Sequence, residues 1–195
     1  MSKKPLPKPT DKRIVKTKKK LESAILKLLE QKPLSDFTVR EICKEAGTTT
    51  ITFYTYYKDK YALASEVFGK MAERAAERFN ELQGSNNPDQ DLPQICCNLL
   101  DSILFVYQEI KTEHSLEIKN PDPYLFVAMS DIIIDKVSDI MGHIEMSESI
   151  NKHAVSSFFC FGLWGYICDG FNQGLSVESI QKEAKHLIRY VINSD

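Results

Sequence analysis

Hydroxyl-bearing and aromatic side chains dominate residues 48–57, which read TTTITFYTYY. Hydroxyls donate hydrogen bonds to phosphates and base edges, while threonine methyls and tyrosine rings pack on thymine methyls and sugars. Helical spacing allows Phe53 and Tyr57 to face a core. The residues that then point outward are Thr49, Thr50, Thr52, Tyr54 and Tyr56. This composition favours a nucleic-acid-reading helix; the alternative is an aromatic-rich core helix of an ordinary bundle.

The residues before this segment predict a second helix and a turn. Thr38 is followed three positions later by Glu41, which is the spacing of a capping box. Gly47 comes after the apolar residues of this helix, where a left-handed residue would end it. A helix, a glycine turn and a short polar helix form the helix-turn-helix arrangement, whose second helix enters the major groove of DNA.

Charge is unevenly distributed along the 195 residues, although the net charge is only −2. Residues 1–60 carry 15 Lys and Arg against 7 Asp and Glu, which gives +8, and the remaining residues carry 10 against 20, which gives −10. A basic end on an acidic body indicates a polyanionic partner. A solvated basic tail without a partner is the alternative.

Composition and motifs exclude several classes of protein. A hydrophobic content of 43% with 8 Gly and 8 Pro excludes a disordered or collagen-like chain. No apolar run approaches the roughly 20 residues that cross a bilayer, and no apolar segment follows the basic N-terminus, so we expect a cytoplasmic protein without a membrane partner. The five cysteines lack CxxC spacing and are expected to be reduced and mostly buried.

Enzyme signatures are missing from the sequence. There is no HExxH or GxSxG motif and no glycine-rich phosphate loop, and the four histidines do not pair at i and i+4. We therefore predict no catalytic residue, no metal, no cofactor and no enzymatic activity.

Apolar periodicity predicts an all-α chain. We expect a flexible basic arm over residues 1–11, a helix-turn-helix domain over 12–60 and a helical domain over 61–195, with a linker at 84–91. The predicted helices cover residues 12–31, 38–46, 48–57, 59–82, 92–110, 113–118, 124–141, 147–173 and 176–193.

Two blocks resemble the DNA-binding domain of TetR-type (TetR/AcrR) transcriptional regulators. Residues 37–47 read FTVREICKEAG and residues 52–63 read TFYTYYKDKYAL. The family pattern is roughly T-V-x-x-I-x-x-x-A-G, a few variable residues, then T-F-Y-x-Y-F-x-x-K-x-x-L, and the resemblance covers about residues 12–70. Two residues depart from it: Ile51 stands where Gly or Pro is frequent, and Tyr57 stands where Phe is common.

The resemblance implies a role in DNA binding for seven residues. Positions 52, 54 and 56 match those that touch phosphates and bases, positions 49 and 50 match the operator-reading ones, and Lys60 matches a phosphate-binding lysine. Arg40 matches a contact to a guanine or a phosphate, with a solvated surface arginine as the alternative. The set is Arg40, Thr49, Thr50, Thr52, Tyr54, Tyr56 and Lys60. Few of these side chains are bidentate donors, so we expect methyl contacts and DNA shape to contribute to recognition.

The resemblance also implies a C-terminal domain for dimerisation and ligand binding. Residues 158–167 are apolar around most of a helix, which requires partners on more than one side. The expected dimer-interface residues are Phe158, Phe161, Gly162, Gly165, Leu187 and Val191. A monomeric core is the alternative.

An effector pocket among the middle helices is a weaker prediction, because aromatic and Met residues at helical spacing also describe plain core. The candidate lining residues are Phe105, Tyr107, His114, Phe126, Met129 and Trp164. The expected function is a homodimeric repressor that a small molecule releases from a palindromic operator in double-stranded DNA. The alternatives are an activator or a helical protein-interaction module without a small-molecule ligand.

Overall fold

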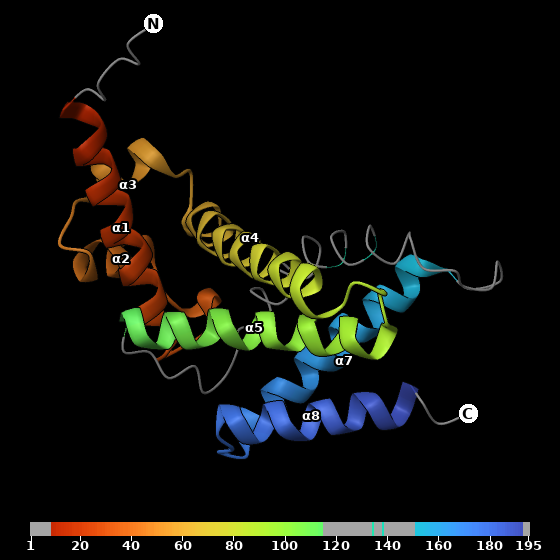
Figure 1. Ribbon diagram of the computed structural model, residues 1–195. Helices are drawn as coiled ribbons and strands as arrows, with labels where there is room; N and C mark the ends of the chain where they lie inside the picture. The colour runs from red at the N-terminus through yellow and green to blue at the C-terminus, as the bar shows by residue number, and fades with distance from the viewer. Residues whose placement is uncertain (1–8, 115–133, 135–137, 139–150, 193–195) are drawn as a thin grey trace, which may run out of the picture. The chain divides into compact units, whose positions relative to one another are not determined.

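The structure, a computed structural model, describes residues 9–114, 134, 138 and 151–192 (Figure 1). Within these residues all regular structure is helical and no strand occurs, as the sequence predicts. The chain divides into two compact units, residues 1–67 and residues 68–195. The predicted helices over 113–118 and 124–141 fall almost wholly outside the described residues.

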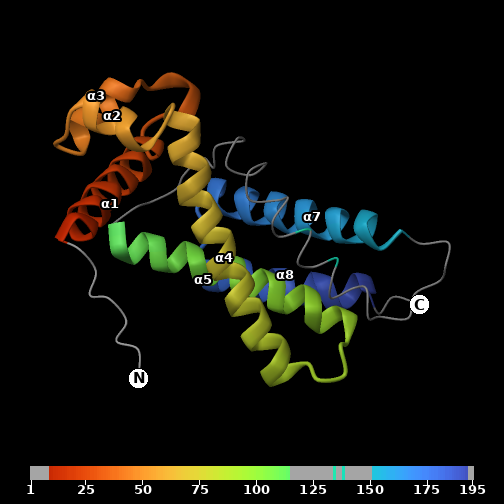
Figure 2. The same cartoon turned by 90° about the horizontal axis from the view of Figure 1, so that it is seen from above.

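The N-terminal unit contains α1 (Pro9–Leu29), the short 3-10 helix η1 (Leu34–Asp36), α2 (Val39–Glu45), α3 (Thr50–Tyr56) and the first turns of α4 (Lys60–Asn86). Helix α2 lies against both α1 and α3 (Figure 2). Every helix contributes to one core, whose fully buried large side chains are Leu21, Ile25, Leu34, Phe37, Ile42, Phe53 and Leu63.

Helix α1 begins at Pro9, earlier than the predicted start at residue 12. Proline suits the first turn of a helix because its φ is already helical and its missing N–H has no acceptor there. Residues 9–11 therefore belong to the helix rather than to an arm, and residues 1–8 lie outside the described residues.

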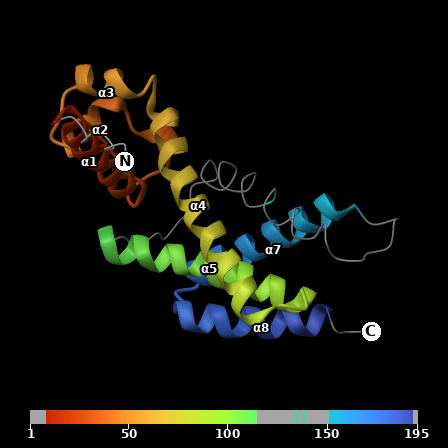
Figure 3. The same cartoon turned by 45° about the horizontal axis from the view of Figure 1, so that its top comes forward.

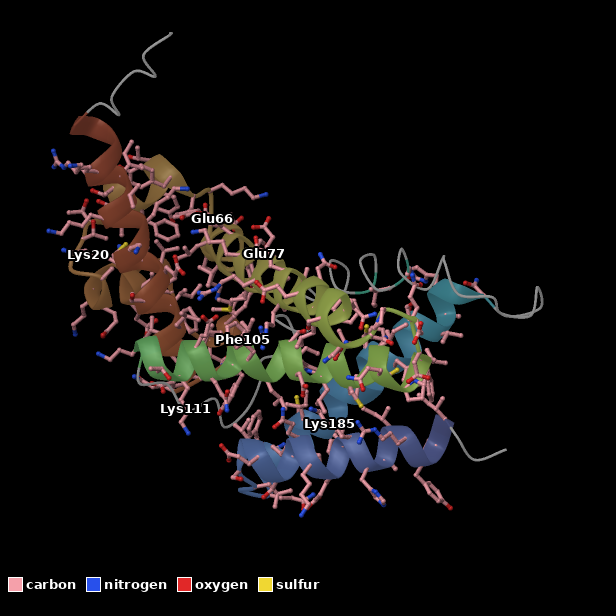
Figure 4. The ribbon with its side chains drawn as sticks, viewed as in Figure 1. Lys20, Glu66, Glu77, Phe105, Lys111 and Lys185 are labelled. Carbon is pink, nitrogen blue, oxygen red and sulfur yellow. The ribbon has the colours of Figure 1, made fainter. Side chains whose placement is uncertain are left out.

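The C-terminal unit contains the rest of α4, then α5 (Leu92–His114), α7 (Lys152–Asn172) and α8 (Val177–Ile192). Helix α8 lies alongside α5 (Figure 3) and buries Ile180, Ala184 and Ile188. At the edge of this contact Asp101 of α5 accepts hydrogen bonds from Gln181 Nε2 at 2.8 Å and from Lys185 Nζ at 2.6 Å (Figure 4). These three buried residues recur every fourth position and form one stripe of α8, whereas Leu187 and Val191 of the same helix are exposed.

The predicted linker over residues 84–91 is shorter in the structure, because α4 continues to Asn86. The buried Asn98 of α5 donates hydrogen bonds to the side-chain oxygens of Gln83 and Asn86, which holds the last turn of α4 in helical form. Asn87 is also buried, and its side chain bonds the backbone of Asp91 in both directions. These contacts between helices outweigh the turn-forming composition of the segment.

Helix α7 is long and apolar enough over residues 153–172 to cross a membrane by length and composition, contrary to the expectation that no segment is. One side of it, with Cys160, Leu163 and Ile167, is buried in the core of the C-terminal unit. Other apolar side chains of the same helix are exposed. The helix therefore has apolar side chains on two faces. One face packs in the core of the C-terminal unit, and the other is exposed.

Candidate nucleic-acid interface

The start of α2 is fixed by the predicted capping box. Thr38 Oγ1 accepts the Glu41 N–H at 3.3 Å, and Glu41 Oε2 accepts the Thr38 N–H at 2.7 Å. Lys32 Nζ donates to Glu41 Oε1 at 2.7 Å. The hydrogen bond from Lys32, followed by those from Thr38, lowers the pKa of Glu41 to about 2. The carboxylate thus stays charged while it caps the helix.

The turn between α2 and α3 depends on Gly47, whose φ of 60° lies in the left-handed region. The N–H of Thr48 donates to the carbonyl of Cys43 at 2.9 Å, which closes the six-residue turn that ends many helices at a glycine. A side chain at position 47 would strain this conformation. Gly47 therefore sets the direction in which α3 leaves the turn.

Helix α3 is capped by Thr49, and two of its aromatic side chains anchor it in the core. Thr49 Oγ1 accepts the Thr52 N–H at 3.2 Å, and the hydroxyls of these two threonines lie 3.0 Å apart. Phe53 is fully buried and Tyr57 nearly so, as the helical spacing predicts. Their rings lie 5.7 Å apart, centroid to centroid. The remaining side chains of α3 are left on its outer side.

The predicted DNA-reading residues of this segment lie on that outer side or at its margin. Thr49 and Tyr54 are exposed, and Thr50, Thr52 and Tyr56 are half-buried. Ile51, absent from the predicted site, is 81% exposed, against 58% for Tyr54. The signal was present in the sequence, because two residues along a helix turn a side chain by about 200°, which puts Ile51 opposite the buried Phe53.

The two predicted basic contacts differ in their surroundings. Arg40 is exposed in the first turn of α2. Lys60 Nζ donates to the carbonyls of Ser35 at 2.9 Å and Phe37 at 2.8 Å. The ammonium carries three donors, so one remains for a phosphate. The binding of loop carbonyls by Lys60 was not predicted, because only the folded chain brings Ser35 and Phe37 to it.

The hydroxyl of Tyr57 explains one departure from the family pattern. It hydrogen-bonds Glu66 of α4, and burial together with this carboxylate raises the pKa of Tyr57. Lys18 Nζ of α1 lies 2.7 Å from Glu66 Oε2 and 5.1 Å from the centroid of the Tyr57 ring (Figure 4). A phenylalanine would leave Glu66 without this donor. Tyr57 thus joins the end of α3 to α1 and α4.

A basic groove lies along α1. Five lysines line it together with Val15, Ser23, Ala24, Glu45 and Ala46, and they are Lys12, Lys16, Lys19, Lys20 and Lys27. Glu45 pairs with Lys27. Five of the 15 Lys and Arg of residues 1–60 therefore share one groove, where their charge suits a polyanion.

The predicted interface residues of the C-terminal unit lie on its surface. Phe158 is 75% exposed, and Phe161, Leu187 and Val191 are exposed as well. A Cβ added at Gly162 or Gly165 would meet no atom within 4 Å. By helical spacing Phe158, Phe161, Gly162 and Gly165 share one outer face of α7, and Leu187, Val191 and the exposed Tyr190 share one outer face of α8.

The predicted effector-pocket residues are only partly described. The Phe105 ring lies 5.2 Å from the Arg78 guanidinium carbon, and the Tyr107 ring stacks on Phe171 with centroids 4.3 Å apart. Trp164 packs half-buried against the core. Phe126, Met129 and the side chain of His114 lie outside the described residues, so the pocket stays a prediction.

The cysteine thiols are free, and four of the five are buried, as expected. Burial raises the pKa of Cys96 and of Cys160 to about 12. A protonated thiol is a poor nucleophile. The adjacent pair Cys96 and Cys97 therefore lacks the lowered pKa that a redox sensor needs.

Comparisons with known proteins agree with this geometry. Residues 22–67 match the family described as bacterial regulatory proteins, tetR family. A curated relative, the uncharacterized HTH-type transcriptional regulator YvdT of Bacillus subtilis (strain 168), is 24% identical over 144 residues, which are 68% of this chain and 71% of the relative.

Solved structures share the fold at low identity. A putative TetR-family transcriptional regulator from Syntrophomonas wolfei matches with a TM-score of 0.64 and 14% identity, covering 90% of this chain and 94% of that one. A TetR-family regulator from Streptomyces coelicolor A3 matches with a TM-score of 0.57 and 12% identity over 99% and 100% of the two chains. Salmonella enterica GusR matches with a TM-score of 0.56 and 14% identity over 94% and 96%.

Proposed function

We propose that the chain is a transcriptional regulator of the TetR family with an N-terminal DNA-binding domain, and that it is a homodimeric repressor which a small-molecule effector releases from a palindromic operator. It is a DNA-binding regulator rather than an enzyme. We place it in the cytoplasm because its proposed ligand is chromosomal DNA.

The outer face of α3 carries this proposal. The helix is short, capped at Thr49, and anchored by the buried Phe53 and Tyr57. Its outer side therefore presents small hydroxyl-bearing residues and Tyr54 in one fixed orientation. The major groove of B-DNA is about 12 Å wide and admits such a helix. Arg40, Lys60 and the lysines of α1 supply cations for the phosphates on either side.

Selection of bound genomic fragments followed by footprinting tests the proposal. We expect saturating protection of a palindrome whose half-site centres lie about 34–36 Å apart, one helical turn. A protein-interaction module with a basic arm would bind DNA only weakly, without sequence preference and with strong salt dependence. That outcome would contradict the proposal that the chain is a sequence-specific regulator.

Tyr54→Ala tests the orientation of α3. Because Tyr54 is 58% exposed, removal of its ring should leave the fold and the dimer intact. We expect operator binding to weaken by about 1–3 kcal/mol, the usual contribution of a base-reading contact. Gln31→Ala, which truncates an exposed side chain outside the basic groove, is the control. Equal operator affinity for Tyr54→Ala and the control would contradict the proposed contact.

The outer apolar face of α7 and α8 supports the homodimer. Exposed phenylalanines beside open glycines suit the close approach of another helix, and a two-fold axis would bring the same face of a second copy against it. Phe158→Glu combined with Leu187→Glu should yield monomers in sedimentation. Asn80→Glu, a charge at an exposed polar site, should leave the dimer intact. A dimer that survives the double substitution would place the interface elsewhere.

The proposed effector acts by a shift of population. A ligand that binds better to a dimer whose two α3 helices are wrongly separated lowers operator affinity by that difference in binding free energy. Compounds processed by enzymes encoded beside the operator are the first to test for release of DNA. The sign of regulation follows from a reporter gene: deletion of a repressor raises expression, whereas deletion of an activator lowers it.

A further inference from the structure

Ile51 is the most exposed of the large apolar side chains in the described residues, at 81%. It is the second residue of α3, and helical geometry puts it opposite the buried Phe53. Tyr54 and Thr55, three and four positions later, lie next to it on the same helix face. The outermost part of the reading helix is therefore aliphatic, although the helix as a whole is rich in hydroxyls.

The hydroxyls near Ile51 are partly occupied within the helix. Thr55 Oγ1 donates to the carbonyl of Ile51 at 2.9 Å, so its proton is not available to a base. Thr49 and Thr52 share a hydroxyl–hydroxyl hydrogen bond of 3.0 Å, which leaves that pair one donor proton between them. Few hydroxyl protons near Ile51 are thus available to bases, so apolar contacts should contribute more to base recognition there.

The major groove offers an isoleucine one apolar partner. Adenine, guanine and cytosine present hydrogen-bonding groups along their major-groove edges, whereas thymine also presents its C5-methyl group. An isoleucine placed against polar edges would remove water from them without replacing its hydrogen bonds. Against a thymine methyl, both groups leave water at no such cost.

We propose that Ile51 selects a thymine in each half-site of the operator by packing on its C5-methyl group. This inference rests on the proposed function, since it requires α3 to enter the major groove. The helix-turn-helix pattern by itself does not predict which base lies opposite position 51.

Deoxyuridine substitution tests the contact, because uracil differs from thymine only by the missing methyl. In an operator obtained by genomic selection, each thymine is replaced in turn, symmetrically in both half-sites. For the wild-type protein we expect one symmetric pair of positions at which binding weakens by roughly fourfold per half-site, the factor that burial of one methyl-sized group is worth. Ile51→Ala should bind the thymine operator more weakly and should not distinguish thymine from uracil at that pair.

Two controls complete this double-mutant cycle. Gln31→Ala, which truncates an exposed side chain of the N-terminal unit outside the basic groove, should retain the full thymine preference. At the same pair of positions, wild-type protein should prefer 5-methylcytosine to cytosine, and Ile51→Ala should not. Alanine is a good helix former and position 51 is exposed, so the fold of the variant is retained.

The outcomes separate this inference from the function on which it rests. Sequence-selective binding in which Ile51→Ala keeps every thymine preference of the wild type overturns the role of Ile51 and leaves the regulator intact. Absence of sequence-selective binding by the wild-type protein overturns both. The proposed contact is supported if Ile51→Ala loses the thymine preference at one pair of positions and the control variant keeps it.

Discussion

On the outer face of α3, small hydroxyl-bearing side chains surround one isoleucine, whereas on the outer face of α7 the exposed side chains are phenylalanines beside glycines. Both faces lie opposite a buried one. The first retains groups that hydrogen-bond water, phosphates or base edges, so it remains hydrated until a polyanion arrives. The second exposes large aromatic rings that gain by leaving water altogether. The same arrangement, a helix anchored on one side, thus suits both kinds of recognition that we propose, of DNA by α3 and of a second copy by α7.

The two units also differ in what holds their helices. In the N-terminal unit, contacts between neighbours in sequence set the helix ends, such as Thr38 with Glu41 and Thr49 with Thr52. In the C-terminal unit, Asn151 and Ser176 also cap α7 and α8 locally, but side-chain contacts between helices are added to these caps, such as Asn98 with Gln83 and Asp101 with Lys185. Variants that disturb one unit, one helix face or one helix cap test these differences between the two units and between the two faces.

The largest expected effect comes from Phe53→Ala. Phe53 is fully buried, so the cavity should cost about 3–5 kcal/mol of unfolding free energy in the N-terminal unit. Operator binding should disappear while the C-terminal unit stays helical and dimeric, as followed by urea unfolding and sedimentation. The neighbouring exposed Tyr54→Ala should change stability by less than about 0.5 kcal/mol. Simultaneous unfolding of both units in Phe53→Ala would show that they do not fold separately.

Two glycines of α7 provide the next comparison. A Cβ at Gly170 would lie 2.7 Å from Ile180 Cγ1, so Gly170→Ala should destabilise the chain by about 1–3 kcal/mol through overpacking between α7 and α8. Gly162→Ala meets no atom and should stabilise the isolated chain slightly, because alanine is the better helix former. Thermal unfolding of the two variants checks this. Gly162→Ala should instead weaken the dimer, and equal effects at both glycines would remove the distinction between the inner and outer faces.

The capping box predicts an effect that depends on pH. Thr38→Ala should lower the unfolding free energy by about 1 kcal/mol near neutral pH. The pKa of Glu41 is about 2 in the folded chain against an ordinary value of 4.5, so the stability it contributes is present above pH 4.5 and is lost as the pH falls towards 2. Glu41→Gln should therefore flatten the acid limb of unfolding curves measured across this range. An unchanged acid limb would mean that the carboxylate gains nothing from its partners.

Lys60→Ala has the smallest expected effect on DNA affinity. If the third donor of Lys60 binds a phosphate, its removal lowers the salt slope of operator binding by about one unit. Lys182→Ala, an exposed lysine of α8, should leave the slope unchanged. An equal slope in both variants would limit Lys60 to the carbonyls of Ser35 and Phe37.

Local signals made the N-terminal unit predictable. The capping box, Gly47 and the spacing of Phe53 and Tyr57 each concern residues within a few positions of one another, and the structure contains all of them. A local signal that was missed is Pro9, which begins α1 before the predicted residue 12, whereas other signals failed because distant residues overrule them. The composition of residues 84–91 predicts a linker, but Asn98 of another helix holds the first part of it in α4. Lys60 was predicted from a pattern, and its carbonyl partners come from a loop that folding brings to it.

The amino-acid sequence by itself determined where α2 begins and ends and that α3 follows a glycine turn, because caps, glycines and helical spacing act over one or two turns. It also determined the apolar stripes that each helix must bury. Only the tertiary structure decided which apolar residues stay uncovered, as Ile51, Phe158 and Leu187 do. The exposure of a side chain depends on which distant segments of the chain pack against it. The spacing of neighbouring residues does not predict those contacts.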